Sequence, residues 1–494
     1  MMNKNDKNDK NDKNDKNDKN DKNDKNDKND KNETFENGLF IFRRDLRTTD
    51  NNGLNILQKT CKNIYPVFIF TPEQVGSGND YKSKNAVQFM IESLQDLEGQ
   101  IAKSGGRLQT FYGKNEKIIR ECIHALNIDV VCFNLDVTPY AIDRDTKIAE
   151  VCKKMEVHTV YGHDYYLHHP GTVMNGSGNA YQKFTPYYEK CLQKKVDEPK
   201  RSAHISFSKN NNKTIPGRIT LSQALTKFVG KGVNKDILVR GGREKAIHVL
   251  KTAHREQHHY QKTHNDLDKH TTQLSAYIKF GCISIREVYH VLRKNTPIIR
   301  QLIWRDFYAN ILYFYPNVLG HSMKKNYNKI KWRYNEGWFR AWCNGTTGFP
   351  IIDAGMRQLN ETGYMHNRAR LIVASFLVKV LLIDWRKGEK YFSTKLTDYD
   401  VASNNGNWQW VAGTGADSQP YFRIFNPWRQ TEEYDPECKY IKEWIPELEG
   451  VPVKDILHWE REWVNHKETE YFKPICSYEI QKEKALQLYK DAIY

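Results

Sequence analysis

The run Leu39-Phe40-Ile41-Phe42 is a short, continuous apolar stretch, which is typical of a strand buried on both faces of a sheet. Similar runs occupy residues 66–70 and 130–133, and residues 157–161 alternate weakly between apolar and polar side chains. Residues 89–101 space their apolar side chains with helical periodicity. Short strands that alternate with amphipathic helices predict an α/β domain with a parallel, Rossmann-like sheet, which we expect to cover residues 37–168.

The composition of the chain changes outside this domain. Residues 169–220 contain Pro-Gly and Gly-Ser-Gly sequences and a polar run, which predict a long connector along the surface. Beyond it, helical patterns rich in Trp, Tyr and Phe replace the strand-like runs, so we expect residues 221–494 to form an all-α domain. Residues 1–36 are dominated by the repeated triplet Asn-Asp-Lys, which has no apolar surface to bury and predicts a disordered tail.

The bulk composition limits the classes of function. The chain has 494 residues with 76 Lys and Arg against 60 Asp and Glu, and this charge of +16 favours an anionic partner such as nucleic acid. Its nine Cys show no metal-ligand spacing, so we expect no metal site and a reducing, intracellular compartment, either cytoplasm or nucleus. No secretory signal is visible.

The most apolar stretch, residues 371–385, is interrupted by Lys379 and Asp384. It is also shorter than the ~20 residues that a membrane-spanning helix needs. It therefore predicts a buried helix, and we expect no membrane association.

Four segments of the helical domain carry candidate chemistry. Residues 271–277, Thr-Thr-Gln-Leu-Ser-Ala-Tyr, place hydroxyls ahead of an apolar helix, where they can cap the helix or hold a phosphate. Residues 301–308, Gln-Leu-Ile-Trp-Arg-Asp-Phe-Tyr, put an aromatic ring beside an Arg, which suits base stacking and phosphate contact. Ordinary capping and core packing explain either segment taken alone.

The third segment, residues 347–370, ends with Arg368 and Arg370 just before an apolar helix. Basic groups there oppose the helix dipole unless an anion or a carboxylate lies nearby. The fourth segment, residues 398–410, begins with Asp398, which could pair with an upstream Arg, and contains Trp408 and Trp410 two residues apart. Two such rings point to opposite sides of a helix, so both sides must be packed.

In this order, the four segments and the opening motif Phe42-Arg43-Arg44-Asp45-Leu46-Arg47 resemble the cryptochrome/photolyase family, most closely the class I cyclobutane pyrimidine dimer (CPD) DNA photolyases. The resemblance covers residues 39 to about 459. It implies an α/β antenna domain, a long connector and an all-helical domain that binds FAD. It also implies a deoxyribodipyrimidine photo-lyase, in which light-excited, reduced FAD passes an electron to a flipped-out dimer and splits it into two pyrimidines.

The resemblance further implies roles for individual residues of the helical domain. The residues implied in FAD binding are Tyr260, Thr271, Thr272, Gln273, Leu274, Ser275, Arg305, Asn367, Arg370, Asp398, Asp400 and Asn404. The residues implied in binding the damaged bases are Gln301, Trp304, Asn367, Arg368, Leu371 and Trp410. Asn404 would face the flavin ring, and its amide cannot readily deliver a proton as an acid would.

A tryptophan relay for electrons is also implied, running from Trp408 near the flavin through Trp385 to Trp332 at the surface. Each of these residues taken alone is explained as a core aromatic. Their spacing along the chain fits the family's relay. Trp304, Asn404 and the three relay residues are therefore the expected catalytic groups.

The choice of lesion depends on the residues at 367 and 371. The related (6-4) photolyases place two His at these positions, where this chain has Asn367 and Leu371, which cannot act as acid or base. Gln301 favours the (6-4) lesion instead, because class I dimer photolyases usually have Glu at this position. A (6-4) photolyase and a cryptochrome photoreceptor without repair activity remain the alternatives, although the low-complexity extension lies at the N-terminus rather than at the C-terminus where cryptochromes often carry one.

Other expectations concern the partners. UV-damaged DNA is the expected substrate, and the protein is expected to act as a monomer. A second, antenna chromophore is left open between a deazaflavin, a flavin and a folate, since the Glu of folate-binding relatives is absent near Thr138. Simple nucleic-acid binding without catalysis does not explain the FAD and relay motifs together.

Overall fold

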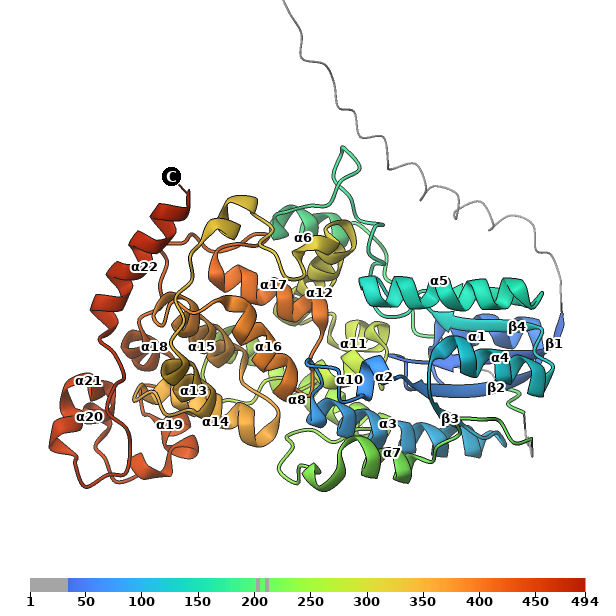
Figure 1. Cartoon of the computed structure of the whole chain (residues 1–494), viewed down its shortest axis with the longest axis horizontal. Coiled ribbons are helices and arrows are strands. Elements are labelled where there is room, and N and C mark those ends of the chain that lie inside the picture. Colours follow the sequence, from blue (N-terminus) through green and yellow to red (C-terminus); the bar gives the residue numbers. More distant parts are fainter. Residues whose placement is uncertain (1–33, 201–204, 209–212, 494) are drawn as a thin grey trace, which may run out of the picture.

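Five parallel strands form the sheet near the N-terminus of the chain (Figure 1). They are β1 (Phe35–Phe42), β2 (Cys61–Phe70), β3 (Gln109–Tyr112), β4 (Val130–Asn134) and β5 (His158–Gly162), in the order β3-β2-β1-β4-β5. The computed structural model describes residues 34–200, 205–208 and 213–493. The predicted α/β fold with a parallel sheet is confirmed, whereas most of the expected tail lies outside the described residues.

The packing of β1 explains why its second half, residues 39–42, is apolar throughout. Leu39 and Ile41 pack with α4 (Asn115–Leu126) and α5 (Pro139–Lys154) on one face of the sheet. Phe40 and Phe42 belong to the core on the other face, under α1 (Asn52–Thr60) and α3 (Lys84–Lys103). Alternate residues of one strand are thus buried on both sides, as a doubly covered parallel sheet requires.

Two details of the sheet differ from the sequence-based expectation. Strand β3 was not predicted, because it is an edge strand of the five-stranded sheet and its sequence Gln-Thr-Phe-Tyr has no continuous apolar run. Strand β1 begins at Phe35, inside the segment assigned to the tail. The carboxylate of Asp129 accepts the backbone N–H groups of Glu36 and Asn37, which holds this beginning of the strand in place.

The predicted connector is more structured than a loop. It contains α6 (Phe184–Leu192), and residues near its end return to the sheet, where Phe207 pairs with Ile64 of β2 and Arg218 with Phe111 of β3. The segment therefore covers the sheet edge before the helical domain begins.

Helices make up the rest of the chain, as predicted (Figure 1). The short α2 (Pro72–Val75) lies in the α/β domain. The helical domain contains α7 (Leu221–Phe228), α8 (Arg243–Glu256), α9 (Tyr260–Thr263), α10 (Ser275–Phe280), α11 (Ile285–Leu292), α12 (Thr296–Phe314), α13 (Glu336–Asn344), α14 (Pro350–Thr362), α15 (Asn367–Lys379), α16 (Trp385–Lys395), α17 (Val401–Ala412), α18 (Pro427–Tyr434), α19 (Lys439–Trp444), α20 (Val453–Leu457), α21 (Trp459–Glu462) and α22 (Tyr478–Ile493).

The two domains share a core instead of merely touching. Phe89 of α3 packs its ring against Tyr277 and Phe280 of α10, with ring centroids 5.2 and 5.3 Å apart. A buried ion-pair cluster lies beside this contact, where the Arg286 guanidinium of the helical domain binds Asp50 and Asp164 of the α/β domain. Because these charges are buried and paired across the junction, the relative position of the domains is well determined.

The apolar stretch at residues 371–385 is buried but is not one helix. Helix α15 ends at Lys379, a turn with Leu382 in the left-handed region follows, and α16 begins at Trp385. Among the residues that the structure describes, no helix is long and apolar enough to cross a membrane.

Candidate functional site: a cavity between α15 and α17

A cavity lies between α15 and α17, with part of α16 along its side. Helix α15 begins where His366 accepts the N–H of Arg368, and α17 begins where the Asp400 carboxylate accepts the N–H of Ser403. The residues that line the cavity are Asn367, Arg370, Leu371, Ala374, Phe392, Leu396, Asp398, Tyr399, Asp400, Ser403, Asn404, Asn407, Trp408 and Val411. The two helix starts therefore bring together many of the residues that the resemblance implied.

The polar wall of the cavity is an ion pair between Arg370 and Asp398. The Arg370 Nη2 atom lies 2.9 Å from Asp398 Oδ2, and Nε donates to the carbonyl of Met365 at 2.9 Å. Burial lowers the pKa of Arg370, but the Asp398 carboxylate outweighs it and the net pKa is raised. The Asp398 carboxylate therefore compensates the Arg370 charge, which the positive end of the helix dipole would otherwise disfavour at the start of α15.

The other oxygen of Asp398, Oδ1, is buried and has no hydrogen-bond partner among the described residues. A buried carboxylate oxygen without a donor costs free energy, so it calls for a ligand that carries an N–H or O–H group. A flavin ring provides such a donor, and the residues of the cavity therefore fit FAD.

Asn404 is held by the neighbouring helix α16. Its amide nitrogen donates to the backbone carbonyl of Glu389 at 3.1 Å, which leaves the amide oxygen as the atom available to a donor in the cavity. Asn405 donates to the Glu389 carboxylate at 2.9 Å and accepts from Gln409 at 3.1 Å. The polar side of α17 is thus fixed by hydrogen bonds before any ligand binds.

The carboxylic acid of Glu389 makes a testable contribution to stability. Burial raises its pKa from 4.5 to about 7, although the Asn405 hydrogen bond opposes this. Because the folded-state pKa is the higher one, the stabilisation is present below pH 4.5 and is lost as the pH rises through about 7. Glu389→Gln should remove this part of the pH dependence, on the order of 1–3 kcal/mol, in urea unfolding measured at both ends of the range. Glu98→Gln, at an exposed position, is the control and should leave the profile unchanged; equal profiles for wild type and Glu389→Gln would contradict the assignment.

The predicted phosphate-binding segment precedes α10. The Thr271 hydroxyl lies 3.1 Å from the Tyr364 hydroxyl, and the Arg370 guanidinium lies over the Tyr364 ring at 5.4 Å. Residues Thr271, Thr272 and Gln273 are half-buried, while Leu274 is buried and Ser275 is exposed. Tyr364 therefore connects this segment to the cavity. Tyr260, also implied in binding, packs its ring on His264.

Of the three residues of the predicted relay, Trp408 alone lines the described cavity. Trp408 lines it and is almost completely buried, Trp385 is fully buried at the start of α16, and Trp332 is half-buried against Tyr489 with ring centroids 5.9 Å apart. The ring neighbours of Trp408 include Trp342, with centroids 6.2 Å apart. The position of Trp342 was not singled out from the sequence.

Gly388 of α16 is required for the position of Trp408. A Cβ atom at residue 388 would overlap the Trp408 ring and a methyl group of Leu377. Gly388→Ala should therefore cost ~1–3 kcal/mol of stability by overpacking and should shift Trp408. The measurement is urea unfolding together with tryptophan fluorescence.

The matched control is Gly99→Ala in α3, where nothing lies within 4 Å of the added Cβ. That change should stabilise the protein by ~0.5–1 kcal/mol, because alanine is the better helix former. A Gly388→Ala protein as stable as Gly99→Ala would show that α16 and α17 pack less tightly than described.

Several implied residues do not line the cavity. Gln301 and Trp304 share one face of α12 and are exposed and half-buried, respectively. The Trp304 ring stacks on Phe184 of α6 at 3.7 Å and 3°. Tyr308, one turn further along α12, contacts α17 so closely that only glycine fits at 406. This contact brings the Trp304 face toward the first turns of α17.

Arg305 contacts the α/β domain. Its guanidinium donates to the backbone carbonyl of Tyr165 at 2.6 Å and lies over the Tyr166 ring, so it ties α12 to the α/β domain. Arg368 binds the side chain of Asn265 and lies over the Tyr434 ring, and Trp410 is half-buried on the side of α17 away from Trp408.

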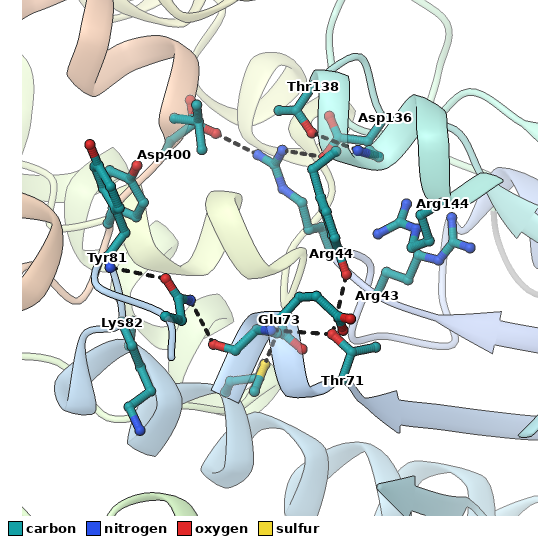
Figure 2. A pocket seen from close by; sticks show the side chains of 18 of the residues that line it. Arg43, Arg44, Thr71, Glu73, Tyr81, Lys82, Asp136, Thr138, Arg144 and Asp400 are labelled. Atoms are coloured by element: carbon teal, nitrogen blue, oxygen red, sulfur yellow. Dashed lines mark hydrogen bonds and ion pairs between the residues drawn. The ribbon is translucent and has the colours of Figure 1, made fainter. Parts of the chain in front are cut away.

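A second, larger cavity of about 480 Å³ lies between the two domains (Figure 2). Arg43 and Arg44 follow β1, Thr71 follows β2 and Asp136 follows β4, so all of them reach it from the carboxyl ends of strands. This is the point where the strand order of the sheet reverses, and ligands of open α/β sheets bind there. Lys279 and Asp400 line the cavity from the helical domain.

Comparison with known proteins agrees with this geometry. Residues 39–203 match the family described as DNA photolyase, and residues 298–491 match the FAD binding domain of DNA photolyase. A deoxyribodipyrimidine photo-lyase of Halobacterium salinarum is 33% identical, over 92% of this chain and 99% of the relative. The chain belongs to the DNA photolyase family, as its motifs predicted.

Solved structures show the same fold. An archaeal photolyase from Sulfolobus tokodaii, with two FAD molecules, superimposes with a TM-score of 0.82 at 39% identity and covers 92% of this chain and 100% of its own. A class III photolyase from Agrobacterium tumefaciens gives a TM-score of 0.85 at 30% identity, over 93% of this chain and 98% of its own.

Proposed function

We propose that this protein is a light-driven DNA repair enzyme that binds FAD in the cavity between α15 and α17 and splits cyclobutane pyrimidine dimers. The observation that carries the proposal is the buried Arg370–Asp398 pair with an unpartnered carboxylate oxygen, in a cavity that Asn404 and Trp408 also line. Reduced FAD, when bound and excited by light, supplies the electron that splits the dimer. The roles of the protein are to hold the cofactor, keep water out and present the lesion.

The residues of the cavity have distinct tasks in this proposal. Arg370 and Asp398 hold the polar edge of the flavin ring, and Thr271 to Ser275 with Tyr260 hold the diphosphate part. Asn404 presents an amide oxygen, which accepts a hydrogen bond but cannot donate a proton. It therefore supports a flavin that stays reduced between rounds of repair. Trp408, Trp385 and Trp332 would form the path along which electrons from the surface reach a bound flavin.

The lesion is presented by residues around the mouth of the cavity. A dimer inside a duplex cannot reach a buried cofactor, so it must be flipped out, which costs less for a damaged step than for an intact one. The half-buried Trp304 ring, which stacks on Phe184, is the proposed stacking partner of the lesion, with Gln301 on the same face of α12 as a hydrogen-bond partner. Trp410 and Arg368 complete the pocket, and the positive charge of the chain holds the DNA backbone.

The residues at 367 and 371 support the cyclobutane dimer over the (6-4) lesion. Asn367 and Leu371 both line the cavity, and neither can act as acid or base. The nearest histidine in sequence, His366, does not line the cavity, and its Nδ1 accepts the N–H of Arg368. Burial lowers the pKa of His366 to about 4, so it is neutral at physiological pH and is a poor substitute acid.

The interdomain cavity is the proposed site of a second, light-harvesting chromophore. Its volume suits a ring system of drug size, and Arg43, Arg144 and Lys82 supply positive charge for an anionic group (Figure 2). The two FAD molecules of the Sulfolobus tokodaii relative support a flavin as one candidate.

Repair of defined lesions tests the proposal. Purified full-length protein with reduced FAD is incubated with two oligonucleotides, one with a thymine cyclobutane dimer and one with a (6-4) lesion, in blue light and in the dark. We expect light-dependent loss of the dimer alone. Repair of the (6-4) lesion would overturn the substrate assignment, and repair of neither lesion by a flavin-loaded protein would indicate a photoreceptor instead.

A further inference from the structure

The two cavities share part of a wall. Tyr399 and Asp400 line both the interdomain cavity and the smaller cavity assigned to the flavin. Asp400 caps α17 through its Oδ1 atom, which accepts the Ser403 N–H at 3.0 Å, while Oδ2 lies 2.6 Å from Arg44 Nη2. The charge of one carboxylate is therefore balanced by a residue of the other domain.

Arg44 occupies the junction between the domains (Figure 2). It follows β1 in the chain and is largely buried, with 16% of its side chain exposed. Its guanidinium binds Asp136 at 2.9 Å and Asp400 at 2.6 Å, and its Nε donates to the carbonyl of Lys279 at 3.3 Å. One planar cation thus connects the end of the sheet to the N-terminus of the helix that carries Asn404 and Trp408. A lysine cannot make this set of contacts.

The charges around Asp400 show which residue keeps its carboxylate ionised. Burial alone would raise the pKa of this carboxylic acid, but the Arg44 charge, followed by Arg305, lowers it well below its usual range. Lys279 is a third nearby cation, and burial and Arg44 lower its pKa to about 8. Asp400 is therefore an anion at neutral pH, and Arg44 is the cation that stabilises it most.

We propose that Arg44 is a positioning residue for the flavin site: by neutralising and orienting Asp400 from the α/β domain, it sets how readily the flavin accepts electrons. The inference rests on the proposed function, because it requires FAD in the cavity between α15 and α17. An uncompensated carboxylate beside the cofactor opposes the addition of negative charge, and the low dielectric of a buried site strengthens this effect. The α/β domain thus contributes to the chemistry of the helical domain.

Equilibrium reduction of the bound flavin tests the inference. Full-length, FAD-loaded protein is titrated with dithionite beside a reference dye of known potential, and flavin absorbance reports the reduced fraction. Arg44→Gln leaves Asp400 without its main cation, so the ratio of reduced to oxidised flavin at fixed potential should fall about tenfold, which is about 30 mV for this two-electron couple. Asp400→Asn leaves Arg44 without its anion, so it should change the ratio in the opposite direction. Asparagine also caps helices well, so α17 keeps its start.

Two controls separate the charge effect from simple damage. Arg243→Gln removes another largely buried arginine, but Arg243 lines neither cavity and pairs with Glu287 at 2.7 Å, so this variant should leave the flavin equilibrium unchanged. The double variant Arg44→Gln/Asp400→Asn removes both charges and should return close to the wild-type ratio. If Arg44→Gln does not fold, the inference is tested by Asp400→Asn and the double variant. The ratio of reduced to oxidised flavin should shift in Asp400→Asn and return toward the wild-type value in the double variant.

The outcomes are distinguishable from a failure of the proposed function. Unchanged flavin equilibria in Arg44→Gln and Asp400→Asn, in a wild-type background that binds FAD and repairs dimers, would overturn this inference alone. Shifts of the same sign in both variants, or an equal shift in Arg243→Gln, would also overturn it. A wild-type protein that binds no FAD would overturn the proposed function and this inference together.

Discussion

The Asp398→Asn protein is expected to lose most of its FAD and about 3 kcal/mol of stability. The substitution keeps the shape of the side chain but removes the charge that pairs with Arg370 at 2.9 Å. Breaking a buried pair leaves an uncompensated charge, which costs more than the pair itself contributes. The change also turns the unpartnered Oδ1 acceptor of Asp398 into part of an amide, which weakens the hydrogen bond it offers to the cofactor.

The measurements are the FAD-to-protein ratio after gel filtration and the free energy of unfolding in urea. Asp80→Asn is the matched control, because Asp80 also forms an ion pair, with Lys390 at 2.8 Å, but both side chains are largely exposed. Exposed pairs contribute ~0–1 kcal/mol, so this variant should keep its FAD and nearly all its stability. An Asp398→Asn protein with a full complement of FAD would mean that the cofactor lies elsewhere.

The Trp408→Phe protein is expected to lose the light-driven reduction of oxidised flavin while keeping its repair activity after chemical reduction. Phenylalanine retains the flat apolar ring that packs on Phe392, but it is far harder to oxidise than tryptophan. Trp408 is the only member of the predicted relay that lines the described cavity, so its loss interrupts the path at the first step.

Flavin absorbance under blue light with an external thiol reductant measures this effect. Trp459→Phe is the control, since Trp459 is as deeply buried but lies on α21, and it should photoreduce normally. Wild-type photoreduction in Trp408→Phe would indicate another route, and Trp342, whose ring lies 6.2 Å from Trp408, would be the first residue to replace.

Much of the fold follows from sequence alone because local and global patterns agree. The apolar runs of β1, β2 and β4 are buried on both faces, and such runs are readily recognised. Strand β3 was not predicted because an edge strand does not need a continuous apolar run. Helix α6 was not predicted because its apolar residues lie between glycine-rich and polar loops.

The candidate site was predictable where residues near one another in sequence act together. Arg370 lies on α15, Asp398 in the turn before α17, and Asn404 on α17, and each belongs to a motif that the sequence analysis singled out. Arg44 and Glu389 were missed as functional residues because their roles depend on contacts across the domain junction or between helices. Gly388 was missed for a related reason, since only the packed structure shows that its missing side chain makes room for Trp408.

The wavelength dependence of dimer repair shows whether light absorbed by the bound, reduced FAD drives the reaction. Chemically reduced, FAD-loaded wild-type protein is mixed with a dimer-containing oligonucleotide, and the rate of dimer loss per incident photon is measured across the near-UV and blue range and in the dark. We expect no repair in the dark and a rate that follows the absorption of the bound, reduced cofactor and of any second chromophore. Dark repair at the same rate, or light-dependent repair whose spectrum does not follow the bound chromophores, would contradict it.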